Sequence, residues 1–398
     1  MKILLMAPQP FFQDRGTPIA VRLLAEALGR EGHTVHLLVF HEGEDVVMDN
    51  VTVHRTGSFP GLHNIRPGFS AKKIVCDLLL WWKSLGLYRR EKFDCVHAVE
   101  EAVFMAMINK IFFRVPYIYD MDSCLSDQLV NKLIFTRPLR PFFRWFEKRA
   151  VRSSAGVLAV CQALAAEAIA FDDTKTVRVV EDISLLQPVS GEGGEDIREQ
   201  FGVEGTLVLY VGNLESYQGI DLLLTGFAVL SAEERLRATL VFIGGVAKHI
   251  DRYTIMAEKL KISKNVRFLG KRPSSDLALY LDQADALASP RKEGENTPMK
   301  IYSYMDSGKV VLATDIRSHT QVLDHSTAVL VSPDAAGVAD GLRTLLNNPD
   351  EMRIRAEKAG QLVQEQYSRE AFERKLREFY CVVSRQIVVS RQNKQQNP

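Results

Sequence analysis

Residues 293–316 read EGENTPMKIYSYMDSGKVVLATDI and carry the pattern from which the fold can be predicted. Thr297 and Pro298 predict the start of a helix, because a Thr side chain can cap a first turn and Pro is favoured at the first helical position. The apolar run KVVLATD (309–315) predicts a buried strand. A helix that leads through a short turn into a buried strand is typical of parallel α/β sheets.

The same alternation of apolar runs and amphipathic stretches extends outward over most of the chain. It predicts two successive parallel sheets, each covered by helices on both faces. The stretch QPVSGEGGED (187–196) is rich in Gly and acidic residues, which predicts a linker. The expected strands are KILLMA (2–7), TVHLLVF (34–40), CVHAV (95–99), PYIYD (116–120) and GVLAV (156–160) before the linker, and TLVLYVG (206–212), ATLVFIGG (238–245), NVRFLG (265–270), DALASP (285–290), KVVLATD (309–315) and TAVLVS (327–332) after it.

Length and composition limit the classes of function. A chain of 398 residues with 46% apolar and 25% charged residues is typical of a globular protein with two domains. The formal net charge of +1 gives no sign of nucleic-acid binding. The five cysteines have no short paired spacing, which argues against zinc and disulfides and favours a reducing, cytoplasmic compartment. No apolar stretch approaches the roughly 20 residues of a membrane span.

Two loops stand out as candidate ligand sites, because ligands bind beyond the carboxyl ends of parallel strands. The first contains Gly16 and Thr17 before Pro18, and the second contains Thr297 and Pro298. Each predicted helix start would present backbone N–H groups to an anion, and the two together favour a diphosphate. Taken alone, each loop is as consistent with an ordinary helix start as with a ligand site. Neither loop has the GxGxxG or Walker pattern, so dinucleotide and P-loop functions have no support.

The residues quoted above resemble those of glycosyltransferase family 4, whose members have the GT-B fold. The segment 293–316 is similar to the donor-binding segment of that family, and the resemblance extends over nearly the whole chain. The other segments that carry it are YVGNLESYQGIDLLL (210–224), VRFLGKRPSSDLALYLDQADALASP (266–290), RGTPIAVRLLAEALGREGHTV (15–35), HAVEEA (97–102) and VPYIYDMDSCLSDQL (115–129).

The resemblance implies an α/β protein with two Rossmann-like, doubly wound parallel-sheet domains that face each other across a cleft. The acceptor-side domain is expected at residues 1–186, a linker region at 187–204 and the nucleotide-sugar domain at 205–365. A helix at 366–388 is expected to pack back on the first domain. The polar residues 389–398 predict a disordered tail, since they offer nothing to bury.

The site residues are carried over from the resemblance position by position. Glu295, Asp122 and Lys300 are the expected catalytic residues. In the family, the position of Glu295 faces the transferring sugar, where a carboxylate can stabilise developing positive charge. The expected donor-binding residues are Gly16, Thr17, Gly212, Asn213, Gln218, Gly244, Asn296, Thr297, Pro298 and Ser303.

Several positions depart from the family pattern. Ser303 replaces a carboxylate that usually binds the donor ribose, and Asp122 replaces a histidine. The basic pair that usually binds the donor diphosphate falls at Asn213 and Gln218, both neutral. The remaining cationic candidates for that role are Lys300, Arg291 and Lys271.

The implied function is retaining transfer of a hexose from a nucleoside-diphosphate sugar, with no metal and no cofactor. The expected acceptor is an unidentified glycan, lipid-linked molecule or small molecule. The departures leave two alternatives open: a catalytically impaired protein that binds a nucleotide or glycan, and a nucleotide-sugar epimerase of the same fold. Asp120 and Asp122 also form a DxD pattern that binds metal in another glycosyltransferase fold, but the repeated plan of two halves argues against that fold.

Basic and aromatic residues interleave in two segments, 66–92 and 132–152. Such a pattern can place a helix on an anionic membrane surface, which predicts a peripheral location at the inner face of the membrane. It is equally consistent with aromatic residues in the core and solvated cations beside them.

Overall fold

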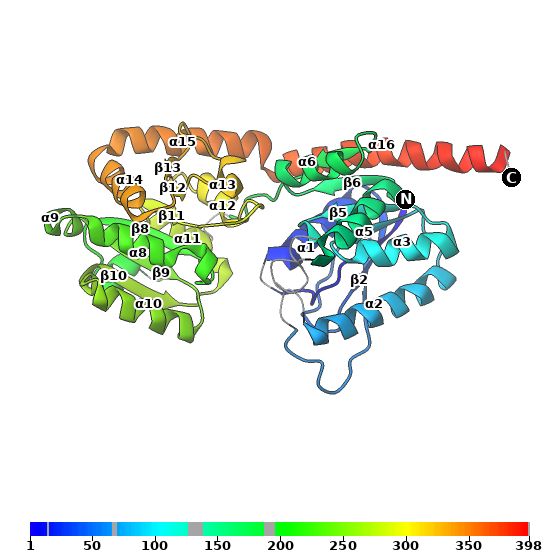
Figure 1. Cartoon of the computed structure of the whole chain (residues 1–398), viewed down its shortest axis with the longest axis horizontal. Coiled ribbons are helices and arrows are strands. Elements are labelled where there is room, and N and C mark those ends of the chain that lie inside the picture. Colours follow the sequence, from blue (N-terminus) through cyan, green and yellow to red (C-terminus); the bar gives the residue numbers. More distant parts are fainter. Residues whose placement is uncertain (14–15, 66–69, 126–137, 187–195, 397–398) are drawn as a thin grey trace. The chain divides into compact units, whose positions relative to one another are not determined.

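The structure, a computed structural model, divides into two compact units (Figure 1). Unit 1 comprises Met1–Glu181 and Glu373–Pro398, and unit 2 comprises Asp182–Phe372. The residues described are 1–13, 16–65, 70–125, 138–186 and 196–396. Parts of four predicted segments lie outside them, namely the linker at 187–195, the two basic segments at 66–69 and 132–137, and the tail at 397–398.

Unit 1 contains a seven-stranded sheet in the order β3-β2-β1-β4-β5-β6-β7, with every neighbouring pair parallel. The connection reverses direction between β1 and β4, which is the arrangement of a doubly wound sheet. The strands are β1 (Lys2–Met6), β2 (Thr34–Val39), β3 (Val51–Arg55), β4 (Cys95–Val99), β5 (Tyr117–Met121), β6 (Gly156–Ala159) and β7 (Val177–Val179).

The helices of unit 1 are amphipathic and bury their apolar stripes on the sheet. Side chains of α2, α3, α5 and α6 form one core cluster with alternate residues of the central strands, such as Leu4 and Met6. Ser70 caps α2, where its side chain accepts a hydrogen bond from Lys73 N. The helices are α1 (Gly16–Arg30), α2 (Ala71–Arg90), α3 (Ala102–Phe113), α5 (Arg140–Ser153) and α6 (Gln162–Phe171).

Unit 2 repeats the plan with a six-stranded parallel sheet in the order β10-β9-β8-β11-β12-β13. Its strands are buried on both faces and consist almost entirely of apolar residues, as parallel strands require. The prediction of two Rossmann-like parallel sheets is confirmed. The strands are β8 (Thr206–Val211), β9 (Ala238–Ile243), β10 (Val266–Gly270), β11 (Ala286–Ser289), β12 (Val310–Thr314) and β13 (Val329–Val331).

Alternate residues of these strands point into two separate cores. Val208 and Tyr210 pack in the cluster with α8, α10 and α14, whereas Leu207 and Leu209 pack in the cluster with α7, α11, α12 and α15. The helices and short 3-10 turns are α7 (Ile197–Phe201), η2 (Ser216–Gln218), α8 (Ile220–Val229), α9 (Ala232–Arg235), α10 (Ala247–Lys259), η3 (Ser263–Asn265), η4 (Ser274–Asp276), α11 (Leu277–Gln283), α12 (Lys300–Asp306), α13 (Arg317–Thr320), α14 (Ala335–Asn347) and α15 (Pro349–Gln366).

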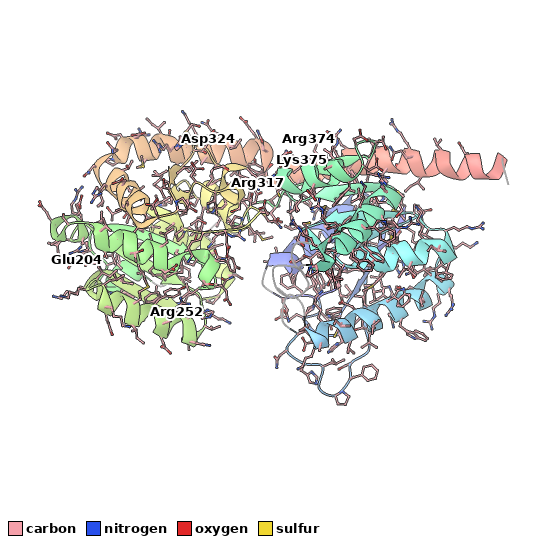
Figure 2. The ribbon with its side chains drawn as sticks, in the orientation of Figure 1. Glu204, Arg252, Arg317, Asp324, Arg374 and Lys375 are labelled. Atoms are coloured by element: carbon pink, nitrogen blue, oxygen red, sulfur yellow. The ribbon has the colours of Figure 1, made fainter. Side chains whose placement is uncertain are left out.

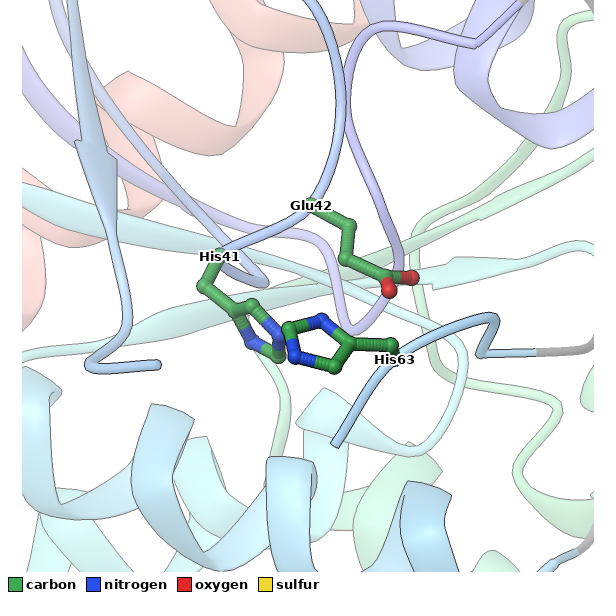
Figure 3. A group of neighbouring side chains, drawn as sticks. All are labelled: His41, Glu42 and His63. Carbon is green, nitrogen blue, oxygen red and sulfur yellow. The ribbon is translucent and has the colours of Figure 1, made fainter. Parts of the chain in front are cut away.

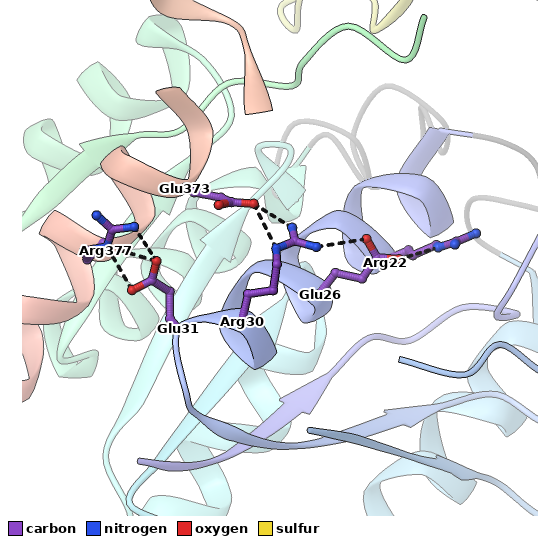
Figure 4. A network of polar contacts seen from close by, with 6 residues as sticks. All are labelled: Arg22, Glu26, Arg30, Glu31, Glu373 and Arg377. Atoms are coloured by element: carbon purple, nitrogen blue, oxygen red, sulfur yellow. Dashed lines mark hydrogen bonds and ion pairs between the residues drawn. The ribbon is translucent and has the colours of Figure 1, made fainter. Parts of the chain in front are cut away.

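The last helix, α16 (Arg369–Gln396), red in Figure 1, packs through most of its length in unit 1. Its Arg377 forms a two-pronged pair with Glu31, and its Glu373 accepts from Arg30 at the end of α1 (Figure 4). In the core, Tyr380 O–H lies 2.7 Å from His97 Nδ1, so α16 is joined to β4 by a buried hydrogen bond.

The structure departs from the sequence prediction at the margins of the sheet and at the end of the chain. Strands β3 and β7 were not expected, because both are edge strands with partly exposed residues and no continuous apolar run. Helix α16 continues to Gln396, through most of the segment predicted to be a disordered tail. No Gly or Pro interrupts residues 369–396, and Arg, Gln and Lys are good helix formers.

Within the described residues, every helix is too short or too polar to span a lipid bilayer.

Candidate functional site

Two glycines, Gly212 after β8 and Gly244 after β9, allow the backbones of these two loops to approach each other closely. Gly212 N donates to Ile243 O at 2.9 Å, and a Cβ atom on Gly244 would lie 2.1 Å from Gly212 O. Both residues have positive φ, +145° and +110°, which favours glycine. The structure therefore brings together two predicted donor-binding residues beside the switch point of the sheet, where α/β proteins bind ligands.

Lys300 lies beside this glycine loop, at the start of α12. Its Nζ donates to Val211 O at 3.3 Å and lies 3.8 Å from the centroid of the Tyr210 ring. Burial lowers the pKa of Lys300 well below its usual value, and the neighbouring Arg291 lowers it further. The ammonium is thus held in an environment where its charge is unfavourable without an anion.

Arg291 follows β11 and supplies a second partly buried cation. Its Nη1 donates to Asn296 O at 2.9 Å, and its guanidinium lies 5.3 Å from the centroid of the Tyr217 ring. Burial lowers the pKa of Arg291. Of the hydrogen bonds and ion pairs formed by described residues, none joins Arg291 or Lys300 to a carboxylate.

A buried histidine supports the loop that carries Arg291. His319 Nδ1 donates to Thr314 O at 2.8 Å, so its Nε2 accepts from Ser289 Oγ, 3.0 Å away. Burial lowers the pKa of His319 to about 4, so the ring is neutral near pH 7. Thr314 Oγ1 in turn donates to Arg291 O. The sequence pattern offered only a weak reason to consider His319 and none to single out Tyr210, although both lie near carboxyl ends of strands, where a site was expected.

The loops of unit 2 that follow β8 and β11 also contain buried polar atoms without a partner. Gln218 and Thr297 are only 8% and 6% exposed. Gln218 Oε1, Thr297 Oγ1 and Arg291 Nε are buried and have no partner among the described residues. Buried polar groups are nearly always hydrogen-bonded in folded proteins, so this group of atoms is typical of a site that awaits a polar ligand.

The helix start predicted at Thr297 and Pro298 is wrong in its position. Helix α12 begins at Lys300, its N-cap position is Met299, and no side chain caps it. Ile301 N donates to Pro298 O, so Pro298 lies in the turn before the helix and leaves Thr297 outside it. The corresponding start in unit 1 is also displaced, since α1 already includes Gly16 and Thr17.

Three other expected donor-site residues of unit 2 differ widely in exposure. Asn213 is exposed, and its Oδ1 accepts from Glu215 N at 3.2 Å. The side chain of Glu295 is 64% exposed and lies 3.4 Å from Arg317 of α13, labelled in Figure 2. Ser303 is buried, and its hydroxyl accepts from Leu185 N at 3.1 Å. This bond uses one lone pair of the hydroxyl that the resemblance assigns to the ribose.

The expected residues of unit 1 lie at the carboxyl ends of its strands. Gly16 is exposed and Thr17 is half-buried in the first turn of α1. Asp122 follows β5 and is half-buried. The neighbouring Asp120 lies 3.0 Å from His97 Nε2, so this member of the DxD pattern already has a hydrogen-bond partner.

Comparisons with known proteins agree with this architecture. The Glycosyl transferases group 1 model matches residues 195–363, and the Glycosyl transferase 4-like domain model matches residues 15–181. The chain is 32% identical over 184 residues to D-inositol 3-phosphate glycosyltransferase of Corynebacterium glutamicum (44% of this chain, 43% of the relative). It is 29% identical over 171 residues to phosphatidyl-myo-inositol mannosyltransferase of Mycobacterium tuberculosis (41% and 44%). The match thus spans less than half the length of either relative.

Solved structures share the fold over almost the whole chain. Sucrose-phosphate synthase from Thermosynechococcus elongatus superposes with a TM-score of 0.78 and 19% identity, over 98% of this chain and 99% of that one. Anabaena HepE in complex with UDP-glucose gives 0.70 and 17%, over 95% and 98%. With its 4-like domain in unit 1 and its group 1 domain in unit 2, the chain belongs to glycosyltransferase family 4 and has the GT-B fold.

Proposed function

We propose that this protein transfers a hexose from a nucleoside-diphosphate sugar bound in unit 2, with retention of configuration and without a metal. The observation that carries the proposal is a pair of cations whose pKa values burial lowers, namely Lys300 beside the glycine loop and the neighbouring Arg291. Neither has a carboxylate partner among the described residues. A diphosphate would supply the missing negative charge.

The energetics favour an anion at this position. A buried cation without a carboxylate partner is unfavourable, so an anionic ligand that pairs with it would be favoured. Arg can meet phosphate oxygens with two N–H groups, and Lys contributes a compact charge. N–H groups that are already in place when the diphosphate leaves stabilise the negative charge that develops on it. The two cations would take over the role of the basic pair that is replaced by Asn213 and Gln218.

The other residues of unit 2 take supporting roles. Gly212 and Gly244 keep the loop free of side chains, so that backbone groups can approach the phosphates. Gln218 Oε1 and Thr297 Oγ1 are buried without partners and can bond hydroxyl groups of the donor. Glu295 is exposed and can turn from Arg317 toward the sugar, where its charge would stabilise the anomeric carbon. From the resemblance we assign Asp122 of unit 1 a catalytic role, and Gly16 and Thr17 a role in donor binding.

The acceptor side has features that suit a membrane-bound substrate. Large apolar side chains are exposed on the adjacent helices α2, α3 and α5, namely Trp82 (76%), Ile111 (73%), Phe112 (72%), Phe142 (55%) and Trp145 (55%). An open groove of about 610 Å³ is lined by Arg140, Arg144, Lys148 and Trp145. Apolar side chains with nearby cations bind the surface of anionic membranes. We infer a peripheral membrane location and a lipid-linked acceptor.

The proposal can be tested with a panel of nucleotide sugars. Each is first tested for binding by thermal shift and then assayed for formation of a glycosylated product. A donor should raise the melting temperature, since it binds only the folded protein. Release of the nucleoside diphosphate with a new glycosidic product supports transfer. Binding without turnover would support the impaired protein instead, and a donor converted to its epimer would support the epimerase.

A further inference from the structure

We propose that His41, Glu42 and His63 of unit 1 form a binding site for a divalent transition-metal ion, with Zn²⁺ as the best fit (Figure 3). Each of these residues offers one ligand atom, and the three atoms lie within 4.8 Å of one another. The proposal does not depend on the function proposed for unit 2. It concerns an ion that ties loops together rather than one that takes part in sugar transfer.

The hydrogen bond of His41 leaves one ring nitrogen ready to bind a metal. His41 Nε2 lies 2.7 Å from Leu62 O, and a carbonyl can only accept, so Nε2 carries the proton. Nδ1 then has a free lone pair, and it is buried with no partner among the described residues. Metal-binding histidines commonly donate their other N–H to a backbone carbonyl in this way.

Backbone hydrogen bonds orient the carboxylate of Glu42. Its Oε1 accepts from Asn64 N at 2.6 Å, and its Oε2 accepts from Ile65 N at 3.0 Å. Each carboxylate oxygen keeps a further lone pair, so these bonds fix the group without using up its capacity to bind a cation. The turn that supplies the two N–H groups also carries His63, and Asn64 adopts a left-handed conformation there (φ 58°).

The ligand set selects the class of metal. Two imidazoles and one carboxylate match the three protein ligands of many zinc sites, which leave a fourth position open. Imidazole nitrogen is a poor ligand for Mg²⁺ and Ca²⁺, which prefer oxygen, so those ions should not compete. The sequence prediction argued against zinc from the spacing of the cysteines, whereas this proposal rests on two histidines and a glutamate, and His41 and His63 lie too far apart in sequence to show a metal spacing.

The ion would connect the loops that follow two strands, β2 and β3. His41 and Glu42 follow β2, whereas His63 lies in the loop between β3 and α2. Glu42 O also accepts from Phe11 N at 2.9 Å, in the loop after β1. A bound ion would therefore stiffen the carboxyl edge of the unit 1 sheet. Its effect should be seen first in the stability of unit 1.

The test is titration of the chelator-treated full-length protein with Zn²⁺, followed by calorimetry and by melting temperature. The wild type should bind one equivalent and melt at a higher temperature with Zn²⁺ than without it. His63→Ala should weaken binding by at least about tenfold and remove the shift in melting temperature. His63 is exposed, so its loss should leave the fold of the metal-free protein intact, which circular dichroism checks.

Two controls keep the outcome decisive. His325→Ala removes an exposed histidine in unit 2 and should bind Zn²⁺ like the wild type. The absorption spectrum of the protein with Co²⁺ in place of Zn²⁺ shows which residues bind the ion. Binding to the exposed Cys381 would add a thiolate-to-cobalt absorption band, and binding to His and Glu alone would not. No binding, equal affinity in His63→Ala, or a thiolate band that survives in His63→Ala would each overturn the proposal.

Discussion

The ammonium of Lys300 lies 3.8 Å from the centroid of the Tyr210 ring. This buried cation therefore contacts an aromatic ring, whereas most buried cations pair with a carboxylate. The ring offers a cation–π contact without neutralising the charge. The Tyr210 hydroxyl donates to Asn213 O at 2.6 Å and so also holds the glycine loop. One side chain therefore positions both the cation and the backbone that we propose to bind the diphosphate.

Because the pKa of free Lys300 is lowered, binding a nucleoside diphosphate should take up protons. An anion favours the charged ammonium and raises its pKa, so proton uptake occurs between the lower free value and the higher bound value. Affinity should fall as the pH rises through the lowered pKa. Calorimetry in buffers of different ionisation enthalpy measures the uptake. Lys300→Met should abolish it, and equal uptake in that variant would assign the proton to another group.

Substitution of Gly244 should damage the donor site through the backbone. In Gly244→Ala, the new Cβ would lie 2.1 Å from Gly212 O at a positive φ, so the two loops must move apart. We expect a loss of about 1–3 kcal/mol in the free energy of unfolding, together with weaker donor binding. Gly86→Ala is the matched control, since nothing lies within 4 Å of its Cβ position in α2. Chemical denaturation compares the two, and equal stabilities would contradict the prediction.

The hydrogen bond between Tyr380 and His97 should matter more to stability than the ion pairs on the surface of α16. Tyr380→Phe leaves His97 Nδ1 unpaired in the core, which should cost about 1–3 kcal/mol. Arg377→Ala removes the pair with Glu31 shown in Figure 4, yet Arg377 is largely exposed, so the melting temperature should change little. The melting temperatures of both variants test this prediction. A larger loss of stability in Arg377→Ala than in Tyr380→Phe would show that the surface ion pairs hold α16 in place.

Membrane binding should depend on the exposed aromatic residues of unit 1. Trp82→Ala combined with Trp145→Ala should reduce cosedimentation with anionic vesicles at low salt, because both rings are exposed and Trp145 lies beside Arg144 and Lys148. Leu236→Ala, at an exposed apolar residue of unit 2, is the control and should bind like the wild type. If the wild type stays in solution with anionic vesicles, the peripheral location and the lipid-linked acceptor lose their support.

The sequence predicted the central strands of both sheets because their apolar runs are continuous, as in β8 and β12. Edge strands such as β3 were not predicted, because their partial exposure to water allows polar residues to interrupt the apolar run. For the proposed site, the sequence segments predicted Gly212, Gly244 and Lys300 as site residues, but they did not reveal the burial of Lys300 or its contact with Tyr210. Those features depend on which side chains meet across elements, and local patterns do not encode such contacts.

Ser303 shows the same limit. The resemblance places it at a ribose-binding position, yet its hydroxyl accepts a hydrogen bond from Leu185 N, far away in sequence. No motif within residues 293–316 could indicate that partner. Its role toward the ribose stays a prediction.

The rate of hexose transfer in Lys300→Met and Glu295→Ala, compared with Gln218→Ala, tests the central claim most directly. Loss of a preorganised group that stabilises charge should lower turnover about 100-fold or more in the first two variants, with melting temperatures that show intact folding. Gln218→Ala removes a neutral amide and should cost much less. Turnover near the wild-type value in both Lys300→Met and Glu295→Ala would contradict the proposed donor site.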